Sequence, residues 1–353
     1  MIRDVRLGYW GERRNVFGML AFILVVLAVP LVFRTPYALS TLVLVGVYTI
    51  VTQGLCLLMG YAGQVSLGQA AFFGMGAYVS AILTTRFGWS PWLALVAAAP
   101  ITGLVAYLFG IPIFRLHGHY LALGTLAFGF IVEIVMKEWR AYTGGPSGLW
   151  GIPRFTLGGA PIKTDLAYYY LVWIAALISM AVALNLVHSR FGRALRALRE
   201  SEEAAESLGI RLSHYKLRAL VISAVFASLA GSLYVHYMIF VSPSAFELDV
   251  SIRFVLMAAV GGMASIWGAP LGAATVILLS LVLREVAPLI SPSATGEIQI
   301  VAYGILLVVI MIFVPDGLTV ALTRAWGRLG GLAGLRQRWL RRRSAGRAVV
   351  RRG

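Results

Sequence analysis

The sequence lacks the residues from which most catalytic and metal-binding sites are built. Its single cysteine, Cys56, lies inside an apolar run, which excludes an intrachain disulfide and a cysteine-based metal site. The five histidines are scattered without the spacing of metal ligands. No Walker A motif, no paired carboxylates and no Ser-His-Asp set at a plausible spacing is present. We therefore expect a chain that is not an enzyme and binds neither a metal nor a cofactor.

Charge is scarce as well. Only 12% of the residues are charged and 59% are hydrophobic, whereas an average soluble domain carries about 25% charged residues. This composition predicts an all-α polytopic membrane protein. The net charge of +16 would suggest a nucleic-acid partner for a soluble protein. In a membrane protein, however, cationic side chains mark the cytoplasmic loops, and we expect no nucleic-acid partner here.

Long apolar runs are abundant. A hydrocarbon core about 30 Å thick requires roughly 20 apolar residues per helix. This criterion predicts about ten transmembrane helices, near residues 16–33, 37–59, 65–83, 92–111, 119–137, 167–188, 219–240, 251–267, 269–287 and 298–314. The glycine-rich segments 60–76 and 261–272 interrupt the pattern, and each is either a complete crossing or a broken or re-entrant helix.

The distribution of Lys and Arg orients the chain. With the N-terminus in the cytoplasm, 22 of the 30 Lys and Arg residues fall in cytoplasmic segments. We therefore predict a multi-pass protein of the bacterial inner membrane with both termini cytoplasmic. Its segments are an N-terminus at 1–15, helices one to six at 16–188, a polar loop at 189–218, helices seven to ten at 219–314 and a tail at 315–353. The tail holds ten arginines from Arg324 onwards, which favours attraction to anionic membrane lipid.

Two glycine-rich segments are the candidates for a pathway through the membrane. GYAGQVSLGQAAFFGMGAY begins at Gly60, and GGMASIWGAPLGAA begins at Gly261. Small residues allow close helix packing, and a broken helix at membrane depth is tolerated where it is buried in protein or lines a cavity. Both interpretations stay open. The similar small-residue character of the second segment hints at internal symmetry between the two halves of the chain. The candidate pathway residues are Gly60, Gly63, Gln64, Ser66, Gly68, Gln69, Gly261 and Gly262.

Ionisable residues inside the predicted helices are few. Glu133 lies one turn from Lys137, and the two can pair near the external surface. Arg253 and Arg284 fall near helix ends and can reach the interface. A proton or sodium relay would need more such residues. The loop Glu138–Leu166, with TGGPSGLWGIPRF, falls outside and is either a plain structured loop or a surface that receives a partner.

The polar loop Ser189–Arg218 interrupts the hydrophobic chain near its middle. Gly192 opens and Gly209 closes a helical pattern, as a glycine C-cap would. Its apolar stripe is Leu195, Leu198, Ala205 and Leu208, and its charged positions are Arg193, Arg196 and Arg199 followed by Glu200, Glu202, Glu203 and Glu206. One interpretation is an amphipathic helix on the membrane surface. The acidic second half, which an anionic leaflet repels, favours a helix that sits in a groove of a cytosolic protein.

Several motifs occur together in one known family. They are GYAGQVSLGQAAFFGMGAY, HYLALGTLAFGFIVEIV, TGGPSGLWGIP, GRALRALRESEEAAESLGI and the segment from YKLRALVIS to GAPLGAA, in this order. From about Tyr48 to Asp316 the chain resembles the LivM-type permease subunits of the branched-chain amino acid (LIV) ABC importers. Phe130 departs from the pattern, because the family has a Glu there after the FG pair, and Glu133 stands one turn later.

The resemblance implies an ABC importer permease fold of ten helices with a cytoplasmic coupling helix. It implies a second, LivH-like permease, two cytosolic ABC ATPases that bind ATP and Mg, and an extracytoplasmic substrate-binding protein as partners. Glu200, Glu203, Ala204 and Gly209 match the coupling motif, beside Arg193, Arg196 and Arg199. The expected function is a pathway for Leu, Ile and Val by alternating access. Urea, amides or other amino acids as cargo, and less readily an ion-coupled secondary transporter, are the alternatives.

Overall fold

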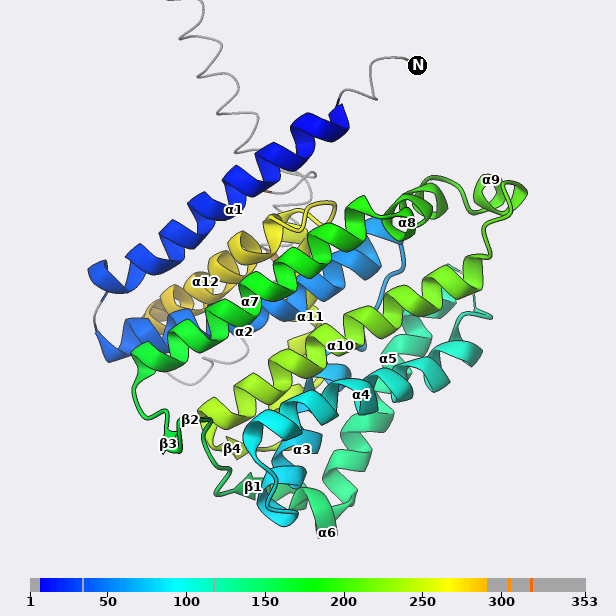
Figure 1. Cartoon of the computed structure of the whole chain (residues 1–353). Coiled ribbons are helices and arrows are strands. Elements are labelled where there is room, and N and C mark those ends of the chain that lie inside the picture. The colour runs from blue at the N-terminus through cyan, green and yellow to red at the C-terminus, as the bar shows by residue number, and fades with distance from the viewer. Residues whose placement is uncertain (1–6, 34, 117, 291–303, 306–317, 320–353) are drawn as a thin grey trace, which may run out of the picture.

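The computed structural model describes residues 7–33, 35–116, 118–290, 304–305 and 318–319. Most of these residues are helical, and the long helices form a bundle (Figure 1). The short helices α8 and α9 lie at one end of the bundle, and α6 and the β-strands lie at the other. We call these the α8–α9 end and the strand end. Apart from two residues each, the predicted helix at 298–314 and the tail at 315–353 lie outside the described residues.

The long helices follow the predicted apolar runs. They are α1 (Leu7–Val32), α2 (Pro36–Leu55), α3 (Gln69–Arg86), α4 (Pro91–Ile113), α5 (His119–Glu138), α7 (Asp165–His188), α10 (Leu212–Met238), α11 (Leu248–Gly261) and α12 (Gly268–Ile290). α2 and α4 each begin with a proline after a side-chain N-cap, Thr35 and Ser90 respectively. Both features are typical helix starts, since proline lacks the N–H that would be unpaired there.

Close crossings of α10 with α2 and α3 form the core. A Cβ at Gly76 of α3 would overlap the backbone of Ser228 in α10, and one at Gly54 of α2 would lie 2.9 Å from the Cβ of Phe226. α10 also packs along α4, so it lies at the centre of the bundle (Figure 1). The small residues thus bring these helix backbones into contact, as in other membrane bundles.

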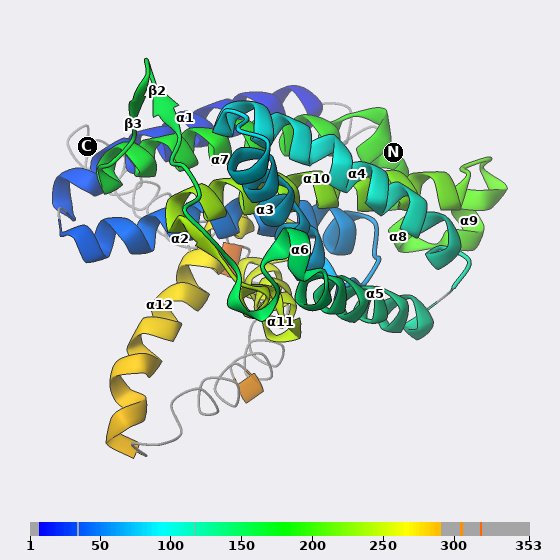
Figure 2. The same cartoon turned by 90° about the horizontal axis from the view of Figure 1, so that it is seen from below.

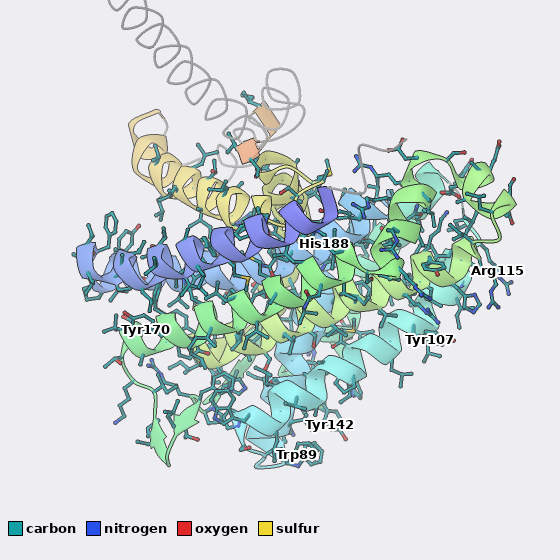
Figure 3. All side chains as sticks on the ribbon, turned by 45° about the horizontal axis from the view of Figure 1, so that its top comes forward. Trp89, Tyr107, Arg115, Tyr142, Tyr170 and His188 are labelled. Atoms are coloured by element: carbon teal, nitrogen blue, oxygen red, sulfur yellow. The ribbon has the colours of Figure 1, made fainter. Side chains whose placement is uncertain are left out.

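The outer helices expose apolar side chains. α4 presents Val96, Leu104 and Leu108 at 59–65% exposure, a surface suited to contact with lipid or another membrane subunit. Aromatic residues gather at the strand end, where Trp89 and Tyr142 lie, while Tyr107 lies toward the opposite end of α4 (Figure 3). Such aromatic positions are typical of the two membrane interfaces.

Five helices of the described chain are long and apolar enough to cross a membrane. They are Pro36–Tyr61, Pro91–Ile113, Tyr120–Glu138, Asp165–His188 and Leu212–Met238. The prediction of a polytopic membrane protein is therefore confirmed, but the count of about ten crossings is not. α11 has 14 residues, about 21 Å of helix, which is shorter than the hydrocarbon core. α12 extends away from the bundle (Figure 2).

Both glycine-rich segments are helix breaks. α2 continues as a π-helical segment, Cys56–Tyr61, and residues 62–68 are irregular before α3 begins. α11 ends at Gly261, and residues 262–267 form turns before α12. The broken-helix interpretation therefore holds for both segments, and the predicted helices 65–83 and 251–267 are shortened by the breaks.

The strand end carries the loop between α5 and α7. It contains α6 (Arg140–Thr143), the 3₁₀ turn Gly145–Ser147, and the strands β1 (Leu149–Trp150), β2 (Thr156–Leu157) and β3 (Ala160–Pro161). β1 pairs antiparallel with β4 (Phe240–Val241), which precedes the 3₁₀ turn Pro243–Phe246, and β2 pairs with β3. Trp150 is 71% exposed, and its ring packs against that of Phe240 at a tilt of 35°. The loop is therefore structured, with an aromatic side chain on its surface.

Candidate functional site

The polar loop forms two short helices rather than the single helix expected between Gly192 and Gly209. α8 spans Arg190–Glu200 and α9 spans Glu202–Ser207. Between them Ser201 has extended backbone, and its side-chain oxygen accepts a hydrogen bond from the Ala204 N–H at 3.2 Å. Ser201 therefore acts as an N-cap for α9, whose first turn carries Glu202 and Glu203 as the helix dipole favours.

Gly209 ends α9 as predicted. Its φ of +79° belongs to the left-handed region, and its N–H donates to the Glu206 carbonyl at 2.8 Å. The Ile210 N–H donates to the Ala205 carbonyl at 3.1 Å, which completes a Schellman motif. Leu208 is 79% exposed at this turn. Leu208 therefore lies outside the apolar stripe in which it was predicted, because α9 ends one residue earlier at Ser207.

α8 and α9 present one buried and one exposed face. Leu195 and Leu198 of α8 and Ala205 of α9 are buried, as predicted from the stripe. The exposed residues include all seven predicted coupling positions, namely Arg193, Arg196, Arg199, Glu200, Glu203, Ala204 and Gly209. The exposed face is thus available to a partner at this end of the molecule.

Charged side chains fasten the two helices to their neighbours. Arg193 and Arg196 donate to the carbonyls of His188 and Val187 at the C-terminus of α7, at 3.3 and 3.4 Å. Cations are favourable at a helix C-terminus because its carbonyls carry partial negative charge. On the other side, Lys216 of α10 bonds both carboxylate oxygens of Glu202 at 2.7 Å. Only 7% of the Lys216 side chain is exposed.

Arg199 connects α8 to the first helix break. Its guanidinium donates to the Gly60 carbonyl in the π-helical end of α2. A Cβ at Gly63 would lie 3.3 Å from the Arg199 Cγ, so the irregular chain after α2 lies directly against this side chain. A displacement of α8 would therefore act on the chain at the break.

The two breaks also meet each other. A Cβ at Gly60 would overlap the Met263 carbonyl, which lies in the turns between α11 and α12. Gly261 and Gly268 on either side of these turns are similarly close, and the Thr319 hydroxyl donates to the Gly261 carbonyl at 2.5 Å. Gly60 and Gly63 thus lie beside Arg199, and Gly60 also meets the turn that follows Gly261 and Gly262, so this group is the candidate site.

The remaining candidate pathway residues lie deeper and are packed. Gly68 approaches the Thr125 carbonyl of α5 with no room for a Cβ, and the buried Gln69 amide bonds both the carbonyl and the hydroxyl of Ser223 in α10. The Gln64 amide donates to the Ala62 carbonyl at 2.9 Å. For these three residues the packing interpretation fits the contacts. Ser66 is 1% exposed, and its hydroxyl has no hydrogen-bond partner within the described chain.

Side chains from other helices cap the N-terminus of α3. The Leu67 N–H donates to the Thr125 hydroxyl at 3.0 Å, and the Ala70 N–H donates to the Ser251 hydroxyl of α11 at 2.9 Å. A buried helix start requires such partners. A cleft lined by Leu67, Ser251 and Glu133 adjoins this point and holds about 10 Å³ of free space, enough for one water molecule.

Two polar clusters were not predicted from the sequence. The Ser179 hydroxyl donates to the buried Gln53 side chain at 2.6 Å and joins α7 to α2. His236 is buried, with Nδ1 2.6 Å from the Pro153 carbonyl and Nε2 2.8 Å from the Ser80 hydroxyl. The carbonyl can only accept, so Nδ1 carries the proton. A lone histidine in an apolar run was the only signal for this cluster.

At the strand end, the predicted Glu133–Lys137 pair is present at 2.6 Å. Lys137 also bonds Glu247, which precedes α11, at 3.2 Å. Across the part of the chain that the structure describes, no three His, Cys, Asp or Glu side chains gather as metal ligands would.

Comparison with known proteins identifies a family that matches most of the chain and several relatives that are similar in sequence. Residues 37–315 match the family model "Branched-chain amino acid transport system / permease component". The chain is 32% identical over 324 residues to the high-affinity branched-chain amino acid transport system permease protein LivM of Salmonella typhimurium, covering 85% of this chain and 74% of that protein. It is 31% identical to LivM of Escherichia coli over the same shares. It is also 24% identical over 293 residues to LivH of Escherichia coli, covering 77% and 90% of the two chains.

Proposed function

We propose, since this chain belongs to the family of permease components of branched-chain amino acid transport systems, that it is the LivM-type permease subunit of an ATP-driven importer. It would form part of the pathway for Leu, Ile and Val. A zwitterion with an apolar side chain needs little fixed charge along its path, in keeping with the few ionisable residues inside the helices.

One observation carries the mechanism. The exposed α8–α9 unit is joined through Arg199 to Gly60, where the two helix breaks meet. We propose that the cytosolic ATPases bind α8 and α9. The contact face would include Glu200, Glu203, Ala204 and Gly209. ATP binding and hydrolysis there would move α8 and, through Arg199, shift the broken helices between inward-open and outward-open states. This chain would bind neither ATP nor Mg itself.

The orientation and partners follow from this proposal. The α8–α9 end faces the cytoplasm and the strand end faces outward, in agreement with the distribution of Lys and Arg. A LivH-like permease completes the pathway, which makes the membrane unit a heterodimer. An extracytoplasmic binding protein delivers substrate to the structured loop at the strand end. About ten crossings, with both termini cytoplasmic, complete the proposed topology.

The cargo is tested by reconstitution. The chain, its co-purifying permease and ATPases and the binding protein are placed in vesicles, and uptake of labelled leucine is measured in competition with isoleucine, valine, urea and other amino acids. We expect competition by isoleucine and valine and dependence on ATP. Uptake that persists without ATP and collapses with an ion gradient would instead support a secondary transporter.

The coupling role of Arg199 is tested by substitution. Arg199→Ala removes the bond to Gly60 but leaves the exposed contact face of α9, so ATPase subunits should still co-purify while uptake per ATP hydrolysed falls at least ten-fold. Arg190→Ala, which changes an exposed arginine at the opposite end of the same helix from Arg199, is the matched control. Equal uptake by both variants would refute the proposed connection.

Glu203→Ala and Gly209→Val test the contact face itself. The first removes an exposed carboxylate, and the second strains a left-handed residue. We expect both to reduce co-purification of the ATPases. Unchanged assembly together with unchanged ATP-driven uptake would refute the placement of the ATPases on α9.

A further inference from the structure

A second cavity lies away from the helix breaks, between the ends of α4 and α10. It has a volume of about 490 Å³ and opens on the surface at the α8–α9 end. α4 ends at Ile113 and α10 begins at Leu212, so the cavity lies where both helices leave the apolar layer. Figure 3 shows Tyr107 on α4 and Arg115 just beyond the end of this helix.

The polar lining of the cavity is basic. Arg115 and Arg218 line it from the two helix ends, and Ser213 and His214 add a hydroxyl and an imidazole. No acidic residue is among the lining residues, and within the described chain neither arginine forms an ion pair. Two uncompensated guanidinium groups favour an anion, and Arg matches the geometry of phosphate oxygens.

The remaining lining is apolar. Ile111 and Phe114 contribute to it from the α4 side, and Leu217 contributes from α10. Leu108 and Leu104, about one and two turns before Ile111 in α4, are each 59% exposed and continue this apolar surface along the helix. A soluble anion would use only the arginines, whereas a phospholipid uses the arginines for its phosphate and the apolar surface for its acyl chain.

We propose that this cavity is a binding site for an anionic phospholipid of the cytoplasmic leaflet. The phosphate lies between Arg115 and Arg218, and one acyl chain lies along the exposed apolar face of α4. The proposal rests on the proposed orientation, which places the α8–α9 end in the cytoplasm. Because α10 also carries Lys216, which holds Glu202 of α9, the bound lipid lies on the helix that supports the proposed coupling unit.

The test measures lipid binding to the purified, delipidated permease complex without substrate or ATP. Phosphatidylglycerol and phosphatidylcholine are titrated, and bound lipid is followed by native mass spectrometry and by thermal unfolding. We expect saturable binding of phosphatidylglycerol. Replacing both arginines, Arg115→Ala with Arg218→Ala, should weaken it about thirty-fold, the effect of two surface cations on an anionic headgroup. Arg190→Ala with Arg211→Ala removes the same charge outside the cavity and should leave binding unchanged.

Two further variants keep the test decisive if the double alanine variant folds poorly. Arg115→Lys with Arg218→Lys retains the charge and should retain most of the binding, while Ser213→Trp fills the cavity and should abolish it with both arginines present. Equal binding of phosphatidylcholine, or equal weakening by the Arg190 and Arg211 control, would overturn the proposal. Inorganic phosphate that stabilises the complex as well as phosphatidylglycerol would assign the site to a soluble anion instead. Loss of uptake with intact lipid selectivity would contradict only the proposed transport function.

Discussion

Gly60 is the residue at which three parts of the chain meet. Its carbonyl accepts from Arg199 of α8, and its Cα faces the Met263 carbonyl between α11 and α12. No side chain fits between these backbones, so glycine is required here for space. The same residue therefore contacts α8 and the turn between α11 and α12 at one point.

Replacing Gly60 should test this close approach. Gly60→Ala forces the turn at Met263 to shift, and we expect a loss of about 1–3 kcal/mol in the free energy of unfolding, the usual range for overpacking. Gly129→Ala in α5 is the matched control, because its Cβ would meet only ordinary contacts at 3.9 Å. The control should be neutral or slightly stabilising, since alanine favours helix. Thermal unfolding in detergent measures both, and an equal melting temperature for the two variants would contradict the role of Gly60.

The two partners of the Lys216–Glu202 ion pair should differ in how much free energy of unfolding is lost when each is replaced. Glu202→Gln leaves an ammonium that is 7% exposed without a carboxylate, and we expect a cost of about 1–3 kcal/mol, the usual penalty for a buried donor that loses its partner. Lys216→Met removes the buried charge and leaves Glu202, 41% exposed, in contact with water, so the cost should stay below about 1 kcal/mol. Glu203→Gln, an exposed neighbour, is the control for the first variant. Denaturation of the purified complex provides the readout, and equal costs for the two truncations would contradict the asymmetry.

At the scale of elements, α8 and α9 form a unit with a bend. α8 is fastened to α7 by Arg193 and Arg196, and α9 is fastened to α10 by Glu202. The Ser201 cap sets the direction of α9 relative to α8. The presentation of the exposed face therefore depends on the Ser201 hydroxyl as well as on these charged side chains.

Ser201→Ala should loosen α9 without removing an exposed side chain of its contact face. Loss of an N-cap costs about 1 kcal/mol, so amide exchange in Glu202–Ser207 should accelerate roughly five-fold. Ser207→Ala in the same helix is the control, because its hydroxyl bonds only the Glu203 carbonyl one turn earlier. Hydrogen exchange followed by mass spectrometry reads both variants. Protection of α9 that survives Ser201→Ala would show that the cap is not what orders it.

The sequence predicted individual helices better than their contacts. Apolar length located α4, α5 and α7 to within a few residues, because these helices are long and mostly uninterrupted. The start of α10 was placed near residue 219, seven residues late, because Lys216 and Arg218 had the character of a loop. Glu202 from another helix compensates the buried lysine, and the Arg199–Gly60 bond joins residues 139 apart. Such distant pairings leave no local pattern in one sequence.

At the scale of the whole molecule, the two ends differ. At the strand end, Lys137 of α5 pairs with Glu133 of the same helix and with Glu247 before α11, and the nearby cleft lined by Glu133 has room for one water molecule. At the other end, Val65 in the first break is 47% exposed. In the described conformation the chain is therefore packed tightly around this cleft, while the first break is accessible to solvent at Val65.

Thiol labelling should detect a change in the accessibility of the first break and of the cleft. Cys56 is buried, so Cys56→Ala gives a background without cysteine, and Val65→Cys and Ala71→Cys report on the first break and on the cleft. Without nucleotide, we expect a membrane-impermeant maleimide to label position 65 from the cytoplasmic side and to leave position 71 unlabelled, because Ala71 is 3% exposed. Trapping with ATP and vanadate in the presence of the binding protein should reverse the pattern. Leu166→Cys, 43% exposed at the start of α7 and away from both sites, should react equally in both states. Labelling at 65 and 71 that is indifferent to nucleotide would rule out alternating access through these two breaks, since any rigid-body opening at the strand end must expose the cleft lined by Glu133.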